Sequence, residues 1–189
     1  MLKQFVSLAL LAVSFNSAAA WQLQNNSSKV SFVSIKKDTI GEVHHFKTLS
    51  GSITDNGDFS VEIDLTTVET NIPIRNERMQ NMLFNTKSFA KLSLNAKVNK
   101  ELAQLTDGTS NVFSVPATLS LNGVEKSLTI DVFAARTNND SLLVTAMSPI
   151  IINASDFNLD AGVAALQKVA GLPNIARAVP VTFVLHFTQ

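Results

Sequence analysis

The chain has 189 residues, carries 15 basic and 15 acidic side chains, and contains no cysteine. The lack of cysteine excludes disulfides, thiol nucleophiles and cysteine-ligated metals. The balanced charge, without a basic run, argues against nucleic acid as a partner, because binding to phosphates needs clustered Lys and Arg.

The first 20 residues have the organisation of a secretory signal peptide. Lys3 gives a positive start, an apolar run follows from Phe5 to Phe15, and alanines at 18–20 form a small-residue cleavage site. A membrane anchor would need about 20 apolar residues, whereas Ser14 interrupts this run and Asn16 ends it. We therefore expect residues 1–20 to be cleaved and residues 21–189 to form one exported domain, with the bacterial periplasm as its compartment.

Most of the remaining chain alternates between apolar and polar residues, which is the period of a half-buried antiparallel strand. In the segment Phe59–Leu65, the odd-numbered residues are apolar and the even-numbered ones polar. Further strands of this kind begin at Val30, Leu92, Val115, Leu128, Leu142 and Val179. The turn sequences at 55–58, 122–123 and 138–140 join neighbouring strands tightly. The pattern predicts an antiparallel barrel or a two-sheet sandwich.

Two segments break the strand pattern. In the first, Val68–Phe89, Pro73 suits a first helical turn, and Met79, Met82 and Leu83 share a helical face with Arg75. This segment is expected to form a helix of two to three turns that covers the barrel.

The second break is Ala161–Ala170, whose apolar residues also fall on one helical face. Asp160 is a suitable N-cap, Gly171 a suitable C-cap and Pro173 a stop. Two short helices are therefore expected beside the strands.

A barrel of about eight strands either fills its interior with side chains or holds one small ligand. The inward positions here are almost wholly apolar, so a cavity among them would suit a long hydrocarbon chain, each buried CH₂ contributing about 0.8 kcal/mol. The alternative is that these side chains simply fill the core. The residues expected to line an apolar ligand cavity are Phe32, Phe59, Val61, Ile63, Met79, Met82, Leu83, Phe84, Phe89, Leu94, Leu119, Ile130, Val132, Val144, Val181, Phe183 and Leu185.

Arg75 and Arg78 have two interpretations. They suit a polar or anionic head group at a cavity mouth, because a guanidinium binds such groups through two hydrogen bonds. They also suit ion pairs with Glu77, Asp64 or Glu69 that would fix the helical segment to the sheet.

The sequence contains no recognisable catalytic motif. Neither H-E-x-x-H, G-x-S-x-G nor a glycine-rich phosphate loop is present. His44 and His45 are adjacent and would point to opposite sides of a strand, which makes them a poor chelating pair. We therefore assign no catalytic residue, no metal ligand and no cofactor. The expected ligand is a bound lipid.

Several motifs together resemble the YceI-like family. The hairpin Thr118–Val132 is the most specific of them, followed by pieces of the segment 68–91, by Leu49–Gly51 and by Ser155–Phe157. Asn76, Asn122 and Ala90 depart from the residues usual in that family. Members are exported bacterial polyisoprenoid-binding proteins with a lipocalin-like barrel.

The resemblance implies a mainly β protein, an antiparallel lipocalin-like barrel of about eight strands with two short helices. It implies a protein without enzymatic activity that sequesters or carries a long isoprenoid lipid, polyprenyl or quinone-like, with transient membrane contact. Two alternatives stay open: a non-catalytic periplasmic stress or interaction protein, and a hydrolase acting on a lipid-like substrate. The oligomeric state is left open.

Overall fold

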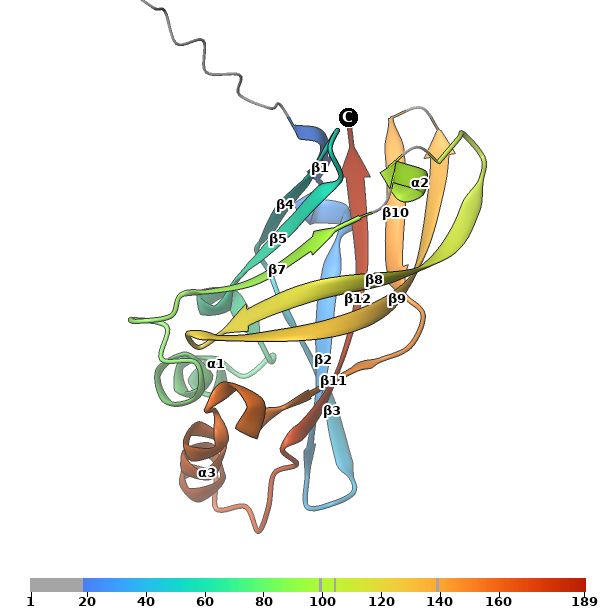
Figure 1. The fold of residues 1–189 in the computed structure, drawn as a ribbon. Coiled ribbons are helices and arrows are strands. Elements are labelled where there is room, and N and C mark those ends of the chain that lie inside the picture. Colours follow the sequence, from blue (N-terminus) through green and yellow to red (C-terminus); the bar gives the residue numbers. More distant parts are fainter. Residues whose placement is uncertain (1–18, 99, 104, 139) are drawn as a thin grey trace, which may run out of the picture.

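The structure is a computed structural model that describes residues 19–98, 100–103, 105–138 and 140–189. The molecule is elongated, with strands along its whole length and two helices at one end (Figure 1). Residues 1–18, which include most of the expected signal peptide, lie outside the described part, as does Asn139 of the expected turn at 138–140. The strands are β1 (Ala19–Leu23), β2 (Lys29–Lys36), β3 (Ile40–Phe46), β4 (Leu49–Thr54), β5 (Asp58–Asp64), β6 (Val68–Glu69), β7 (Lys91–Lys97), β8 (Ser110–Leu121), β9 (Val124–Asn138), β10 (Ser141–Ala146), β11 (Ile150–Asn153) and β12 (Ala178–Thr188).

Within the described residues, eight antiparallel strands close into a barrel in the order β1-β4-β5-β7-β8-β9-β10-β12. The ring closes where β1 pairs with the end of β12, Leu23 lying opposite Phe187. Two turns that the sequence predicts connect neighbouring strands of this ring. Asn122 and Gly123 both have positive φ between β8 and β9, as a two-residue hairpin turn requires. The predicted antiparallel barrel is confirmed.

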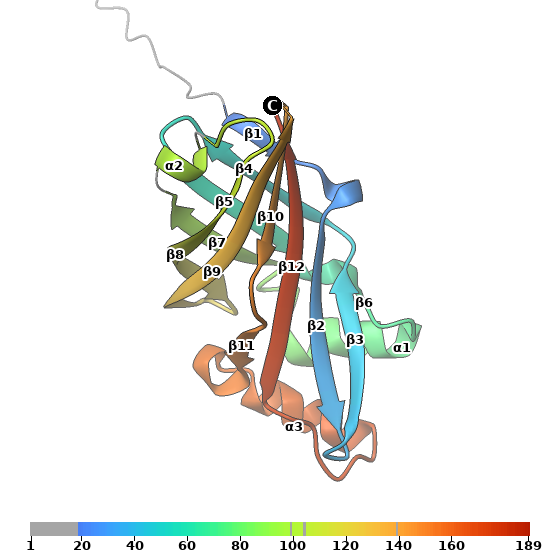
Figure 2. The same cartoon turned by 90° about the vertical axis from the view of Figure 1, so that its right-hand side faces the viewer.

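The long strand β12 continues beyond the barrel and organises a second region. Its last residues pair with β10 and β1, whereas its first half pairs with β2 on one side and β11 on the other. β3 and β6 extend this sheet past β2. In Figure 2 the strands β2, β3 and β12 run down to the end of the molecule where the helices lie.

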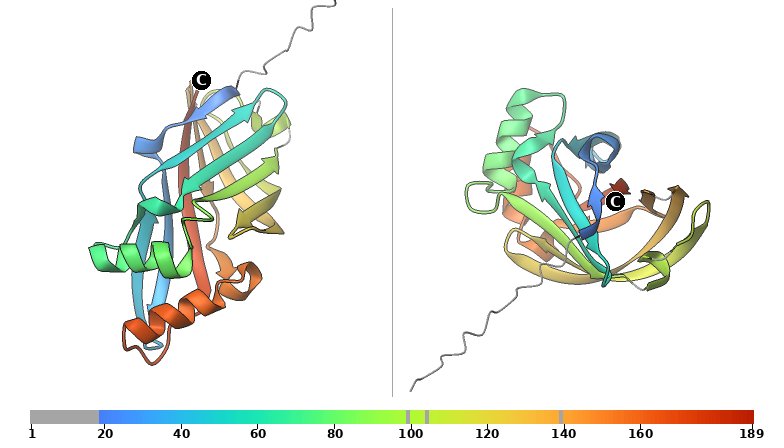
Figure 3. Two further views of the ribbon diagram at one scale, coloured as in Figure 1. Left: turned by 90° about the vertical axis from the view of Figure 1, so that its left-hand side faces the viewer. Right: turned by 90° about the horizontal axis from the view of Figure 1, so that it is seen from above.

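The two longer helices, α1 (Pro73–Arg78) and α3 (Asp160–Val169), lie at that end of the molecule (Figure 3). α1 begins with Pro73 at its first turn, as predicted, and runs directly into a π-helical turn, Met79–Leu83. α3 ends before Gly171, which has positive φ. The short helix α2 (Lys100–Ala103) and the 3₁₀ turns Asn25–Ser27, Leu65–Thr67 and Ala154–Phe157 complete the helical structure of the described residues.

The upper half of the barrel is filled with side chains. Trp21, Ile53, Leu142 and Phe187 are each at most 2% exposed there. The Phe59 ring packs edge-on against Phe187, with the ring centroids 6.0 Å apart. The barrel proper is therefore a packed core at this end, and the space for a ligand lies elsewhere.

Candidate functional site

A cavity of about 590 Å³ lies in the lower half of the molecule. Strands β2, β3, β11 and β12 line it on one side, strands β5, β7, β8 and β9 close it above, and α1, the π-helical turn and α3 cover the rest. The volume falls within the range of about 300–1,000 Å³ typical of small-molecule sites. Among the described residues that line it, all but six are apolar.

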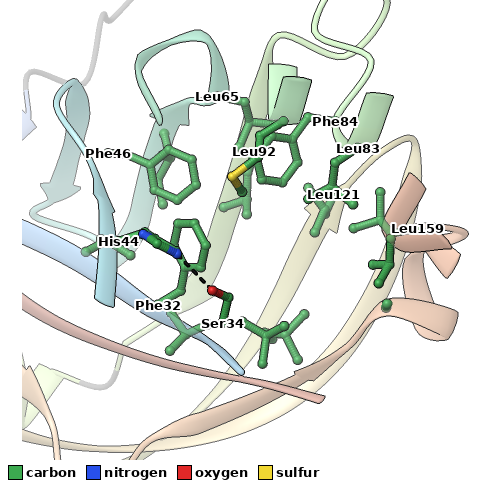
Figure 4. A pocket seen from close by; sticks show the side chains of 18 of the residues that line it. Phe32, Ser34, His44, Phe46, Leu65, Leu83, Phe84, Leu92, Leu121 and Leu159 are labelled. Atoms are coloured by element: carbon green, nitrogen blue, oxygen red, sulfur yellow. Dashed lines mark hydrogen bonds between the residues drawn. The ribbon is translucent and has the colours of Figure 1, made fainter. Parts of the chain in front are cut away.

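Aromatic rings form one wall of this cavity, as Figure 4 shows. The Phe32 and Phe46 centroids are 5.4 Å apart, and Phe84 lies 6.1 Å from Phe46. Leu83, Leu121 and Leu159 stand on the other side of the view from Phe32 and Phe46. Flat rings facing branched aliphatic side chains offer an extended hydrocarbon ligand close contact without any demand for hydrogen bonds.

The helical wall depends on one glycine. Gly162 of α3 lies against the π-helical turn so closely that a Cβ atom would be 2.7 Å from the Met82 carbonyl oxygen and 2.8 Å from the Leu83 Cα. Because both are backbone atoms, a side chain at this position would force the two helical segments apart. The close approach holds Leu83 and Val163 together in the wall of the cavity.

The cavity opens where its lining residues are exposed to solvent. These residues are Ile72 and Ile74 at the start of α1 and Val169 and Ala170 at the end of α3. The outer end of the β2–β3 hairpin lies on the same side of the molecule (Figure 2). The polar lining residues come from the strands and helix that border this opening, and they are Ser34, Lys36, Glu42, His44, Arg75 and Arg78.

His44 is the most deeply buried of these polar groups, at 2% exposure. Its Nε2 lies 2.8 Å from the Ser34 hydroxyl (Figure 4), and Nδ1 has no hydrogen-bond partner in the described part of the chain. Burial lowers the pKa of His44 below its usual value, and the positive charge of Arg75 lowers it further. The imidazole is therefore neutral at neutral pH and offers hydrogen bonds without adding charge.

The Ser34–His44 contact also bears on catalysis, because a Ser–His pair is two-thirds of a hydrolytic triad. A triad needs a carboxylate on the second ring nitrogen, and within the described residues Nδ1 of His44 has no partner. The nearby Glu42 is instead bound to Lys36 at 2.7 Å and Arg75 at 2.9 Å. The pair lacks the group that would orient the imidazole as a general base.

Arg75 fixes α1 to the sheet. Its guanidinium donates to Glu42 on β3 and to the Thr70 carbonyl oxygen at 2.7 Å. Hydrogen bonds from Lys36 and Arg75 lower the pKa of Glu42 against the opposing effect of burial. Of the two interpretations given to Arg75, these contacts favour the structural one, although the partner is Glu42 and not Glu77, Asp64 or Glu69.

Arg78 differs from Arg75. It lines the cavity and is half-buried, yet its side chain has no hydrogen bond or ion pair within the described residues. A cation of this kind at the opening can bind a polar or anionic group of a ligand without first breaking an internal contact.

A second polar cluster supports α1 from outside the cavity. Glu69 accepts hydrogen bonds from the Asn71 backbone at 2.6 Å and the Asn76 side chain at 3.0 Å, and it pairs with Lys47. Asn76 in turn accepts from Thr70. The Lys47 contact, aided by the two asparagines, lowers the pKa of Glu69 to about 2.

The structure brings most of the residues expected to contact a ligand together around the cavity. Those that line it are Phe32, Val61, Ile63, Met79, Leu83, Phe84, Leu94, Leu119, Ile130, Val181, Phe183 and Leu185, together with Arg75 and Arg78.

The remaining expected residues lie elsewhere. Phe59, Val132 and Val144 line a separate void of about 30 Å³ near the filled end of the barrel. They share the inward face of their strands with the cavity residues, but the packed core occupies that end, so they do not reach the cavity.

Met82 and Phe89 also lie outside the cavity. The Phe84 amide donates to the Met79 carbonyl, a π-type bond across five residues. The wider turn brings Leu83 and Phe84 inward with Met79 and leaves Met82 exposed, whereas an α-helical spacing predicted Met82 inside. The Phe89 ring lies close to Gly123 of the β8–β9 hairpin.

Sequence reasoning missed many of the lining residues, and two groups of them are informative. The first is the inner face of α3, with Val163, Leu166 and Val169, whose helical spacing was recognised but not assigned to the cavity. The second is Ser34, Lys36, Glu42 and His44, which share one face of β2 and β3. Alternation along 40–46 is weak, because Gly41 and Val43 face solvent, so no clear strand signal was available.

Neither a metal cluster nor a membrane-spanning helix is found among the described residues. They contain no cluster of three or more His, Cys, Asp or Glu side chains able to hold a metal ion. Among the helices of this part of the chain, none has the length and apolar character needed to cross a bilayer.

The fold and the cavity together define a lipocalin-like barrel protein with an apolar internal site. The chain belongs to the YceI-like family, since the model of the YceI-like domain matches residues 21–187. No curated protein matches it.

Solved structures support this assignment. A polyisoprenoid binding domain from Saccharophagus degradans, implicated in plant cell wall breakdown, is 35% identical with a TM-score of 0.89, covering 91% of this chain and 99% of that one. BcnA of Burkholderia cenocepacia is 19% identical with a TM-score of 0.68, over 87% and 98% of the two chains. The YceI protein of Campylobacter jejuni is 14% identical with a TM-score of 0.55, over 77% and 84%. The last two similarities concern the fold alone.

Proposed function

We propose that this protein binds a long isoprenoid lipid, polyprenyl or quinone-like, and sequesters or carries it. The observation that supports this best is the cavity of about 590 Å³, in which all but six of the described lining residues are apolar. Each CH₂ buried there contributes about 0.8 kcal/mol. A tail of several isoprene units therefore binds without specific polar contacts.

The distribution of polar groups gives the lipid an orientation. The tail lies against Phe32, Phe84 and Leu121, and the head group lies near His44 and Arg78. Neutral His44 and the Ser34 hydroxyl provide hydrogen bonds, while Arg78 provides an unpaired cation. The relative from Saccharophagus degradans is described as a polyisoprenoid binding domain, which agrees with this class of ligand.

The signal peptide expected at residues 1–20 supports a periplasmic location for this proposed activity. There the protein would keep an insoluble lipid out of water during movement between membranes. Sequestration involves no bond making, and the Ser34–His44 pair without a carboxylate partner favours binding over hydrolysis.

The proposal is tested by expressing the complete chain with its own amino-terminal segment and isolating the periplasmic fraction. Organic extraction of the purified protein, followed by mass spectrometry, should release an isoprenoid lipid in near-equimolar amount. Protein that carries no lipid and takes up no added isoprenoid would contradict it. Incubation with a serine-directed fluorophosphonate tests the hydrolase alternative, and Ser34 should stay unlabelled.

A further inference from the structure

The opening of the cavity bears exposed apolar side chains. Ile72, Ile74 and Val169 are 43%, 51% and 43% exposed, and the same three residues line the cavity. They come from two helices that are far apart in the sequence and border one opening. The apolar surface of the cavity thus continues outward onto the surface of the molecule, which is unusual unless something covers it.

Ile40 extends this surface. It lies opposite Lys36 in the β2–β3 ladder, so the two side chains share one face of the sheet, and Lys36 lines the cavity. The chain that follows α3 is fixed to this hairpin, since Lys36 pairs with Ile175 and Asn174 donates to Asp38 at 2.6 Å. Hydrogen bonds therefore fix the β2–β3 hairpin, which carries Ile40, to the chain that follows α3.

The charges around the opening are mainly positive. The charged residues that line the cavity are Lys36, Arg75 and Arg78 against the single carboxylate Glu42, which leaves two positive charges. Exposed Lys168 beside Val169 adds one positive charge and exposed Glu77 beside Arg78 one negative charge, so the excess stays at two. Neither Arg78 nor Lys168 has an ion pair in the described part of the chain. The chain as a whole is neutral, so the positive charge is a local property.

From these observations we infer that this surface docks on an anionic lipid bilayer. The docking face consists of Ile40, Ile72, Ile74 and Val169, flanked by Arg78 and Lys168. Apolar side chains inserted among head groups, next to cations that attract anionic lipids, are the features of an interfacial membrane contact. The inference rests on the proposed function, because docking with the opening against the bilayer lets an isoprenoid tail enter the cavity without crossing water.

The test is flotation of the mature chain with vesicles of phosphatidylethanolamine and phosphatidylglycerol. The variant carries Ile40→Ser and Lys168→Glu, two exposed positions that do not line the cavity. The control carries Val112→Ser and Lys29→Glu, which make the same chemical changes at exposed positions. Lys29 and Lys36 are the two ends of β2, about 23 Å apart at the rise of an extended strand.

We expect the wild type and the control to float with the vesicles and the Ile40/Lys168 variant to bind about tenfold more weakly, because a reversed charge and a lost apolar group both act at the surface. Equal binding by the variant and the control overturns the inference. A wild-type protein that stays off the vesicles also overturns it, and favours a protein partner for this face.

Loading with a short polyprenol from detergent is measured in parallel on the same three proteins. It should be unchanged in the variant, because neither changed residue lines the cavity. Normal loading without flotation refutes docking but not lipid binding. Flotation of a protein that never loads refutes the proposed function but not docking.

Discussion

Phe183 separates the cavity from the filled end of the barrel. It is 7% exposed and lines both the cavity of about 590 Å³ and the smaller void of about 30 Å³. Leu94 and Ile130 are the other described residues shared by the two spaces. Replacing Phe183 by alanine removes the ring between them, so the cavity becomes deeper and should accept a longer isoprenoid tail.

The cost of this change follows from the burial of the ring. A buried Phe→Ala substitution lowers the free energy of unfolding by about 3–5 kcal/mol, of which about 24 cal/mol is lost per Å³ of empty space. In a domain of this size each kcal/mol corresponds to about 2–4 °C in Tm. A lipid tail that fills the new space restores the part of the unfolding free energy that was lost to the empty volume. The Tm deficit of Phe183→Ala should therefore be smaller with a long-chain ligand than without one.

The assay combines thermal unfolding with mass spectrometry of the retained lipid. Phe183→Ala should retain a population shifted toward longer chains than the wild type. The matched control is Phe59→Ala, because Phe59 lines only the smaller void and packs on Phe187. The Phe59→Ala control should be destabilised but should retain lipids of the same chain length as the wild type. Identical lipid populations in Phe183→Ala and the wild type, or the same shift in the control, would refute this account of the cavity.

Four further outcomes follow. Gly162→Ala should destabilise the protein by about 1–2 kcal/mol in urea unfolding. Two backbone atoms within 3 Å of the new Cβ place the overpacking cost at the upper end of its usual range, about 2–3 kcal/mol, and helix propensity returns about 1 kcal/mol. An equally stable variant would contradict the close helix contact. Arg75→Ala should lower Tm by several degrees, by loss of its ties to Glu42 and Thr70, while a folded variant that has lost only its lipid would make Arg75 a head-group residue. Because burial lowers the pKa of His44 below 6.5, the imidazole takes up a proton more readily in the unfolded chain than in the folded one. The free energy of unfolding should therefore fall as the pH drops below 6.5. His44→Phe should reduce this dependence of the unfolding free energy on pH. The pKa of Glu69 is about 2 against 4.5, so its contribution is complete above pH 4.5 and lost as pH falls toward 2, and the Tm difference between wild type and Glu69→Gln should shrink over that interval.

The strands with strict alternation could be predicted from sequence, and so could the tight turn at Asn122-Gly123. Both depend on local rules, namely side chains on opposite faces of a strand and positive φ in a two-residue turn. Alternation alone could not distinguish a barrel from a sandwich. The resemblance of the motifs to the YceI-like family predicted that the sheet closes into a barrel.

The position of the cavity along the barrel depends on long-range packing and could not be predicted. Phe59 and Ile63 belong to the same strand face, yet one contacts the filled core and the other the cavity, because α1 and α3 hold the lower end open. The inward turn of Leu83 instead of Met82 depends on the π-helical turn Met79–Leu83, which residue spacing does not reveal. The polar side chains that line the cavity come from β2, β3 and α1, so the sequence of any one segment could not predict that they lie together.

The central claim is that the lipid tail occupies this cavity, and photocrosslinking tests it most directly. An isoprenoid with a photoreactive group near the end of its tail would be loaded into the purified protein, irradiated and mapped by peptide mass spectrometry. Crosslinks should fall on peptides that contain Leu94, Ile130 or Phe183, at the deep end of the cavity. Crosslinks confined to the outer faces of the strands, with these peptides unmodified, would contradict the account.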